Sequence, residues 1–315
     1  AEGRDGPANM SRLCVKGRYG FNYVNSDQRL TVPLARKKGV SKDINPEDFD
    51  LNNVENYFEP ISWDEAIKRT TEKFKSLVMD DSRSTAGFGC AKGSNEEAYL
   101  FQKLVRTGFR NNNVDHCTRL CHASSVVALL EMIGSGAVSN QVADVAEAET
   151  IIVIGANPTV NHPVAATFIK NAAKAGKNLI VLDPRKNDLA RHATHYLQFK
   201  PDTDVALLNA IMKSIIDQNL MDEKFINERT TDFDDLKSHL DDFTPEKMSS
   251  ICGIDADVID EVARIYASSS ASIIFWGMGV SQHIHGTDNA RALISLALMT
   301  GQVGRPGTGL HPLRG

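Results

Sequence analysis

Hydrophobic residues gather into short continuous runs along the second half of the chain. Runs rich in Ile, Val and Leu occupy residues 150–155, 178–183 and 272–277. Strands that are buried on both faces of a parallel sheet have this pattern, because neither face meets water. A further, more polar strand is predicted over residues 195–199. These segments predict the strands of a parallel sheet.

Between these runs, apolar residues recur at helical spacing. Longer helices are predicted over 163–175, 204–218, 257–268 and 287–300, and shorter helical pieces over 126–133, 186–192, 222–228, 234–240 and 245–252. This alternation predicts an α/β fold, a doubly wound, mostly parallel sheet with helices on both faces. Residues 301–309 are rich in glycine and are expected to be flexible or irregular.

The first half of the chain is patterned less regularly. Residues 1–59 are rich in Gly, Asn, Asp and Pro without a sustained period, so they are not expected to form a core alone. Ser62 and Glu65 have capping-box spacing and predict the start of a helix. A strand at 85–89 and a helix at 94–109 follow. We therefore divide the chain into an irregular segment (1–59), part of a split α/β domain (60–115) and a larger α/β domain (116–315).

The composition narrows the classes of function. The net charge is -5, so electrostatics give no support for binding nucleic acid or a membrane surface. No apolar run approaches the roughly 18 residues of a membrane helix. The first residues lack an apolar core and an initiator methionine, so we expect no secretory signal and a truncated or processed chain.

Cysteine usage points to a reducing compartment. The five cysteines are scattered and odd in number, which does not suit a disulfide framework and favours the cytoplasm. Cys90 and Cys252 are interpreted as small buried hydrophobic residues.

The run at residues 116–125 carries the strongest chemical signal. It looks like a loop of small and polar residues and places the thiol of Cys121 beside the imidazole of His122. A thiolate is a soft metal ligand, and an imidazole can move protons near neutral pH. A zinc site made by His116, Cys117, Cys121 and His122 is implausible, because four ligands within seven residues cannot surround a metal tetrahedrally.

Each of four predicted strands ends in a polar or glycine-rich loop, at 155–161, 183–186, 200–204 and 277–282. Ligands of doubly wound sheets bind at these carboxyl ends. Glycine lets the backbone approach a phosphate, and aspartate accepts hydrogen bonds from a guanine edge or a ribose. Taken singly, each loop is equally compatible with ordinary turn chemistry. Four in succession indicate a large, nucleotide-like anion, although the simple NAD and ATP fingerprints are absent.

Several segments occur in the order seen in the molybdopterin oxidoreductase family, and this resemblance spans nearly the whole chain. They are VIGANP (153–158), LDPRK (182–186), DTD (202–204) and GMGVSQH (277–283). Three more segments resemble the formate dehydrogenase branch, namely NMSRLCVKGRYG (9–20), LCHASS (120–125) and HPLRG (311–315). The resemblance implies the fold of domains 1–3 of formate dehydrogenases and DMSO reductases. It also implies two molybdopterin guanine dinucleotides with molybdenum or tungsten.

The resemblance further implies roles for five residues. Cys121 corresponds to the metal ligand, and His122 to the proton-handling residue beside the metal. Arg314 corresponds to the arginine that grips the carboxylate of formate through two parallel bonds. Lys16 corresponds to a lysine between an iron–sulfur cluster and one pterin, and Cys14 to the last cysteine ligand of that [4Fe-4S] cluster. The other three cluster cysteines have no counterpart before Cys14, and one thiolate cannot hold such a cluster.

Contacts to the cofactor are implied at further positions. They comprise Lys16 and residues of the strand-end loops, namely Gly155, Asn157, Asp183, Pro184, Arg185, Asp202, Asp204, Met278 and Gln282. In this scheme residues 1–59 are the remnant of an iron–sulfur cluster domain. Residues 116–315 are the dinucleotide-binding domain that carries the metal ligand.

The activity implied is the reversible oxidation of formate to carbon dioxide. Either a hydride leaves formate, or His122 takes a proton while two electrons enter the metal. Electrons would pass Lys16 to the [4Fe-4S] cluster, then iron–sulfur or flavin partner subunits, and finally NAD in the cytoplasm. One alternative is another molybdopterin enzyme, such as an assimilatory nitrate reductase, which His122 and Arg314 disfavour. The other is a non-catalytic iron–sulfur subunit of the NADH dehydrogenase type, which the presence of Cys121 also disfavours.

Overall fold

The computed structural model describes residues 1–7 and 9–314, and the chain divides into two compact units. The first unit contains Ala1 and Val15–Cys117, and the second contains Glu2–Cys14 and Thr118–Gly315. The three predicted segments, 1–59, 60–115 and 116–315, are a different division and stay a prediction.

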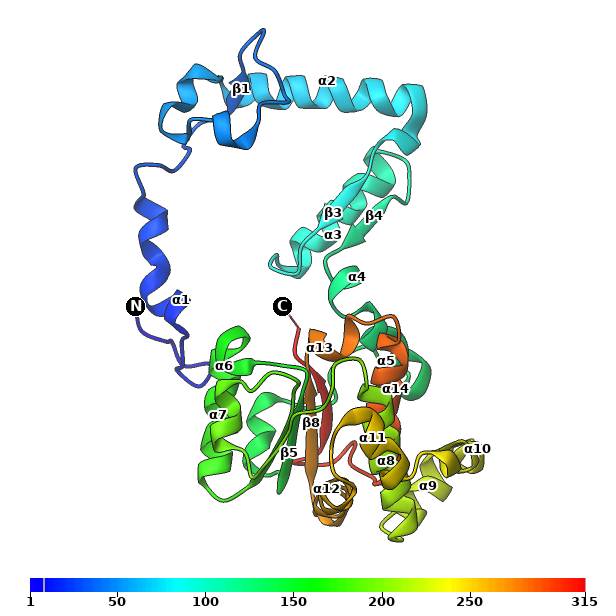
Figure 1. Cartoon of the computed structure of the whole chain (residues 1–315). Coiled ribbons are helices and arrows are strands. Elements are labelled where there is room, and N and C mark those ends of the chain that lie inside the picture. The colour runs from blue at the N-terminus through cyan, green and yellow to red at the C-terminus, as the bar shows by residue number, and fades with distance from the viewer. Residues whose placement is uncertain (8, 315) are drawn as a thin grey trace. The chain divides into compact units, whose positions relative to one another are not determined.

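The first unit consists of short elements and two longer helices (Figure 1). Its elements are α1 (Val15–Tyr19), η1 (Gly20–Asn25), β1 (Leu34–Arg36), η2 (Pro46–Asp48), η3 (Leu51–Asn56), β2 (Phe58–Pro60), α2 (Trp63–Asp81), η4 (Ser82–Ser84), β3 (Gly87–Gly89), α3 (Asn95–Lys103), the π-helix η5 (Leu104–Gly108) and β4 (Val114–His116). β1 pairs with β2 antiparallel, and β3 pairs with β4 in parallel.

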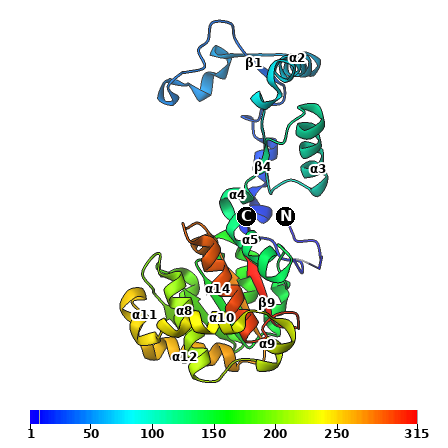
Figure 2. The same ribbon diagram turned by 90° about the vertical axis from the view of Figure 1, so that its right-hand side faces the viewer.

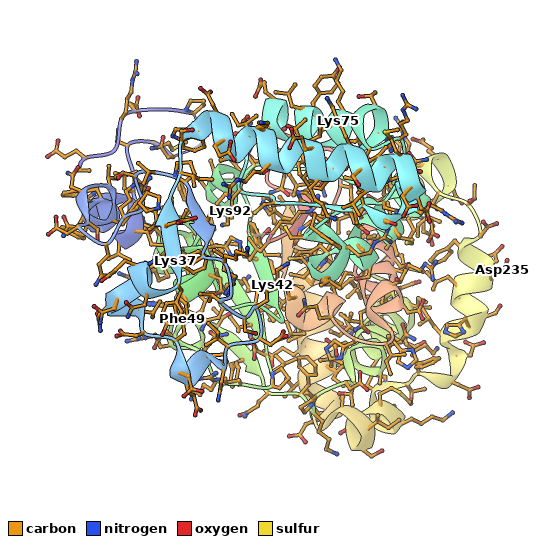
Figure 3. The ribbon with its side chains drawn as sticks, turned by 90° about the horizontal axis from the view of Figure 1, so that it is seen from above. Lys37, Lys42, Phe49, Lys75, Lys92 and Asp235 are labelled. Carbon is orange, nitrogen blue, oxygen red and sulfur yellow. The ribbon has the colours of Figure 1, made fainter. Side chains whose placement is uncertain are left out.

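Side-chain caps start both longer helices of this unit. The Ser62 hydroxyl accepts a hydrogen bond from the Glu65 amide at 3.1 Å, which confirms the predicted start of α2. Ser94 and Glu97 form a complete capping box at α3. The charged side chains labelled on this unit in Figure 3, those of Lys37, Lys42, Lys75 and Lys92, are exposed.

The second unit contains the regular α/β structure. Its elements are α4 (Thr118–Cys121), α5 (Ala123–Ile133), η6 (Val142–Ala146), β5 (Thr150–Ile154), α6 (Pro158–Asn161), α7 (Pro163–Lys174), β6 (Asn178–Leu182), η7 (Asp188–His192), β7 (His195–Leu197), α8 (Asp204–Asp217), α9 (Glu223–Arg229), α10 (Phe233–His239), η8 (Leu240–Asp242), α11 (Pro245–Cys252), α12 (Ala256–Ser268), β8 (Ser272–Trp276), α13 (Met278–Ser281), α14 (Gly286–Met299) and β9 (Gly309–Pro312).

Within residues 118–314, five strands form one parallel sheet in the order β7-β6-β5-β8-β9. Ile152 of β5 lies opposite Ile180 of β6 on one side and Ile274 of β8 on the other. All five residues of β5 and of β8 are buried, as their continuous hydrophobic pattern predicts. The doubly wound parallel sheet is therefore confirmed.

Helices cover both faces of the sheet, because successive strand residues point to opposite sides. Ile152 and Ile154 belong to a core cluster with residues of α5, α8, α12 and α14. Ile151 and Val153 belong to a second cluster, which includes Ile169 of α7. Figure 1 shows α6 and α7 on one side of the sheet and α5, α8 and α14 on the other. In Figure 2 the side with α8 and α14 faces the viewer.

Three expectations were wrong. Residues 118–121 form the one-turn helix α4, although the run at 116–125 looks like a loop. The irregular segment ends at Gly309, where strand β9 begins. The sequence did not predict this strand, which is formed by pairing with β8. Cys252 is fully buried, but Cys90 is exposed, because it follows the three-residue strand β3, which lies outside the main core.

Candidate active site

The candidate site lies at the carboxyl edge of the sheet, where the strand order reverses. From β5 the chain moves outward to β6 and β7, and it returns on the other side through β8 and β9. The chain therefore leaves the neighbouring strands β5 and β8 toward opposite sides of the sheet. Doubly wound sheets bind ligands at such a point. The loop residues named from the sequence, from Gly155 to Gln282, follow the carboxyl ends of β5, β6, β7 and β8.

Glycines bring the two diverging loops into direct backbone contact. The Gly279 amide donates to the Gly155 carbonyl at 3.0 Å. A Cβ on Gly155 would lie 2.8 Å from the Gly279 carbonyl carbon, and Gly155 has a φ of 56°. Close packing of the two loops thus explains why Gly155 is glycine, and an approach to phosphate stays a prediction for it.

Cys121 and His122 are held at this edge by the junction of two helices. Cys121 ends α4, and His122 has a φ of -137° and a ψ of 25°, so it breaks the helix before α5 begins. The His122 ring is fully buried, and its Nε2 lies 3.0 Å from the Leu313 carbonyl oxygen. Because a carbonyl can only accept, Nε2 carries the hydrogen, and Nδ1 faces Ser125 Oγ at 3.3 Å.

Two serines and a tryptophan complete this buried network, and sequence reasoning gave them no role. Trp276 Nε1 donates to Ser125 Oγ at 2.8 Å. The Ser281 hydroxyl donates to the Cys121 carbonyl at 2.9 Å and lies 3.4 Å from His122 Nδ1. The signal that could have found them is their placement, since Ser125 lies in the His122 segment and Ser281 in the loop after β8. The network fixes the orientation of the imidazole.

Arg314 follows strand β9 and comes close to Cys121. One guanidinium nitrogen donates to the Gly136 carbonyl, and Nε is buried without a hydrogen-bond partner among the described residues. Burial lowers the pKa of Arg314, and the charge of the Cys121 thiolate acts in the opposite direction. Burial also lowers the pKa of His122, the Leu313 carbonyl opposes this shift, and the charge of Arg314 adds to it. The structure thus brings Cys121, His122 and Arg314 together, whereas Gly315 lies outside the described residues.

Three aspartates gather at the ends of β6 and β7. Asp204 starts α8 with only 2% of its surface exposed, and its Oδ1 has no partner among the described residues. Burial raises the pKa of Asp204 to about 6, His283 opposes the shift, and Asp202 and Asp183 add to it. Burial also raises the pKa of Asp183. A buried carboxylate oxygen without a donor is suited to a ligand that brings N–H or O–H groups.

The remaining loop residues named from the sequence make local contacts. Asn157 Oδ1 accepts from the Thr159 hydroxyl at 2.6 Å, and the Arg185 amide donates to Asp183 Oδ1 at 2.8 Å. The Pro184 carbonyl accepts from the side-chain Nε2 of Gln198 at 2.9 Å. Gln282 Nε2 donates to the Leu120 carbonyl at 2.7 Å, which ties the loop after β8 to α4.

Two more residues after β8 complete the description of this edge. The side chain of Met278 is 42% exposed. His283, to which we assigned no role, reaches Asp202 with Nδ1 at 3.0 Å and the Gly279 carbonyl with Nε2 at 2.7 Å. It therefore links the loop after β7 to the loop after β8.

The two residues named for the iron–sulfur cluster belong to different compact units. Lys16 is an exposed residue of α1 in the first unit. Cys14 is partly buried and belongs to the second unit, in which the Arg12 guanidinium lies 4.3 Å from the centre of the Phe168 ring in α7. Their roles stay predictions.

The described residues contain neither a ready group of metal-binding side chains nor a helix that could span a membrane. No group of three or more His, Cys, Asp or Glu side chains there could hold a metal ion. No described helix combines the length and the apolar character that crossing a membrane requires.

Comparison with known proteins places the chain in a family. Residues 29–314 match the family model described as molybdopterin oxidoreductase. The chain belongs to the molybdopterin oxidoreductase family. Within that family, it is 38% identical to the F420-dependent formate dehydrogenase 1 subunit alpha of Methanococcus maripaludis, over 98% of this chain and 43% of that protein.

Other relatives of this molybdopterin oxidoreductase chain have similar names. It is 36% identical to formate dehydrogenase H of Escherichia coli, over 100% of this chain and 43% of that protein. It is also 36% identical to the putative formate dehydrogenase YrhE of Bacillus subtilis, over 99% of this chain and 30% of that protein. The chain thus spans less than half the length of these relatives.

A solved structure supports the fold. Acetylene hydratase from Pelobacter acetylenicus superposes with a TM-score of 0.81 at 22% identity, over 97% of this chain and 40% of that chain. At this identity the likeness concerns the fold alone.

Proposed function

We propose that this chain is the part of a molybdenum- or tungsten-dependent formate dehydrogenase that supplies the metal-binding sulfur and the formate-binding arginine. The observation that carries the proposal is the meeting of Cys121, His122 and Arg314 at the reversal point of the sheet. The relatives with 36–38% identity named above are formate dehydrogenases, which supports the same activity.

The residues at this edge fit a pterin-bound metal. Cys121 offers one thiolate, and the described residues offer no second and third ligand beside it, so a metal there would draw its other ligands from pterin sulfurs. Asp204 offers a buried, unpartnered oxygen that suits the N–H groups of a guanine. The other residues that would contact the dinucleotides are Gly155, Asn157, Asp183, Pro184, Arg185, Asp202, Met278 and Gln282. When bound, the cofactor supplies two-electron chemistry that no side chain of this chain provides.

The chain's own residues have separable tasks. Arg314 would bind the formate carboxylate, because its buried Nε has a hydrogen to donate and no acceptor within the described part of the chain. His122 would take a proton at Nδ1, since Nε2 already donates its hydrogen to the Leu313 carbonyl. Burial of His122 and Ser125 keeps bulk water away from this nitrogen.

Electron transfer forms a second part of the proposal. Electrons would leave past Lys16 to a [4Fe-4S] cluster with Cys14 as one ligand, then to iron–sulfur or flavin subunits and to NAD. The free thiols of Cys90, Cys117, Cys121 and Cys252 suit a reducing, cytoplasmic setting.

The decisive experiment is formate-dependent dye reduction by the full-length protein, together with analysis of its molybdenum and tungsten content. We expect the wild type to contain one of these metals and to reduce the dye with formate. Arg314→Ala should lower kcat/KM for formate about a hundredfold, because the carboxylate loses a buried charged partner. Arg314→Lys should recover only part of this loss, because a lysine cannot form two parallel bonds. Turnover of nitrate instead of formate, or absence of both metals, would refute the proposal.

A further inference from the structure

Two histidines hold the segment that carries Arg314. His122 Nε2 lies 3.0 Å from the Leu313 carbonyl oxygen, and His162 Nε2 lies 2.7 Å from the Arg314 carbonyl oxygen. Both nitrogens must donate, because a carbonyl only accepts. His122 precedes α5, and His162 lies between α6 and α7. Consecutive carbonyls of one segment are therefore held from two separate parts of the fold.

The segment needs such support because the sheet stops holding it at Leu313. Strand β9 lies at the edge of the sheet and pairs only with β8 in the described structure. The Leu313 amide still donates to the Trp276 carbonyl at 2.8 Å, continuing the ladder by one bond. One residue later, the side chain of His162 provides the hydrogen bond to the Arg314 backbone.

His162 is itself well anchored. Its amide donates to the Pro158 carbonyl at 3.0 Å, and its carbonyl accepts from the Ala166 amide at 2.9 Å. Pro163 follows directly and begins α7, while His162 keeps a non-helical backbone, with φ -135° and ψ 58°. The ring therefore projects from a fixed point at the end of the loop after β5.

We propose that His162 is a positioning residue for Arg314, which sets the placement of the guanidinium beside Cys121 by holding the Arg314 carbonyl. We call the hydrogen bond from His162 Nε2 to the Arg314 carbonyl the clamp. The identity of the ligand that Arg314 binds rests on the proposed function, but the clamp does not. The guanidinium has a second anchor on the Gly136 carbonyl, so backbone and side chain are held from different sides. A small displacement of the reacting groups is enough to cost a large factor in rate.

The first experiment measures the clamp without turnover. Amide hydrogen exchange of Leu313 is followed by mass spectrometry in full-length His162→Leu and His162→Gln. His162→Leu removes the donor and should speed exchange about fivefold to tenfold, which corresponds to the loss of one hydrogen bond. His162→Gln keeps an N–H donor at a similar reach and should stay near the wild type. His239→Leu, in exposed α10, serves as the matched control.

The second experiment separates KM from kcat in the cofactor-loaded enzyme. His162→Leu should raise KM for formate about tenfold with metal content unchanged, and His162→Gln should restore most of it. If the Leu313 amide exchanged at the same rate in His162→Leu as in the wild type, the inference would be overturned. Equal loosening of α7 and the sheet in both variants would also overturn it, because His162 would then be merely structural. If the wild type does not oxidise formate, the proposed function fails, and the exchange data alone decide the clamp.

Discussion

The two compact units share the same local signals for helices but differ in what those helices bury. In the first unit, α2 and α3 start at well-formed serine caps, yet Trp63 and Ile67 of α2 are 66% and 59% exposed. Among the described residues of that unit, Val105 is the one fully buried hydrophobic side chain. In the second unit, β5 and β8 are buried along their whole length between two layers of helices. Caps therefore set where a helix starts, whereas the core comes from packing.

The difference explains where precise chemistry can be placed. Cys121, His122 and Arg314 belong to the second unit, and their contacts join segments that the core holds in register. A reacting group must be kept within a fraction of an ångström of its working position, which requires rigid support. The described residues of the first unit have exposed apolar helix faces, and they do not form a buried core that could hold reacting groups in this way.

The largest contrast should appear when cysteines of the two units are replaced in the full-length protein. Cys121→Ala should lower formate-dependent dye reduction at least about a thousandfold, because the proposed metal loses its protein ligand. Cys90→Ala and Cys117→Ala, which alter exposed thiols of the first unit, should stay within about twofold of the wild type. Substantial activity in Cys121→Ala would remove the basis for placing the chemistry in the second unit.

Matched isoleucine substitutions test the contrast in packing. Ile274→Ala empties a fully buried position in β8 and should lower the free energy of unfolding by about 2–5 kcal/mol. Ile67→Ala removes the same atoms from a 59% exposed position in α2 and should change it by about 0.5 kcal/mol or less. Urea denaturation followed by circular dichroism measures both. Equal losses would show that the first unit has a core that the described contacts do not reveal.

The sequence predicted the parts of the fold that depend on local pattern. Strands β5, β6 and β8 are continuous hydrophobic runs, so each could be recognised without knowing its neighbours. Strand β9 could not, because Gly309 and Pro312 lack strand propensity and the strand exists through its pairing with β8. The one-turn helix α4 is too short to have a period.

The same limit applies to the candidate site. Cys121, His122 and Arg314 could be named from the family resemblance, and the structure brings them together. Ser281 and His162 could not, because their contacts to Cys121 and Arg314 join residues 160 and 152 positions apart. No local pattern records which carbonyl such a side chain will meet.

Stability should also depend on pH through one buried carboxyl group of the second unit. The pKa of Asp204 is raised from 3.8 to about 6 by burial, so the folded state holds the proton more tightly than the unfolded state. The resulting stabilisation is fully present below pH 3.8 and is lost as the pH rises through 6, for a total of about 3 kcal/mol. Urea denaturation between pH 4 and 7.5 measures the slope.

Two variants show whether that slope belongs to Asp204. Asp204→Asn should flatten it, because the amide does not titrate. Asp81→Asn, at a carboxyl group of the first unit that is 43% exposed and whose pKa is lowered by Arg83, should leave the slope between pH 4 and 7.5 unchanged. An unchanged slope in Asp204→Asn would assign the pH dependence to other groups.

The smallest expected effect compares two glycines that share a left-handed backbone but differ in their neighbours. Gly155 of the second unit has a φ of 56°, and a Cβ there would lie 2.8 Å from Gly279 backbone atoms. Gly39 of the first unit has a φ of 87° with no atom within 4 Å of such a Cβ. Alanine at either position costs about 1 kcal/mol of backbone strain. Gly155→Ala should cost about 1–2 kcal/mol more, because the loops after β5 and β8 must separate. Equal unfolding free energies for the two variants, measured in urea, would mean that the two loops can part freely, and the site edge would then be less rigid than its contacts imply.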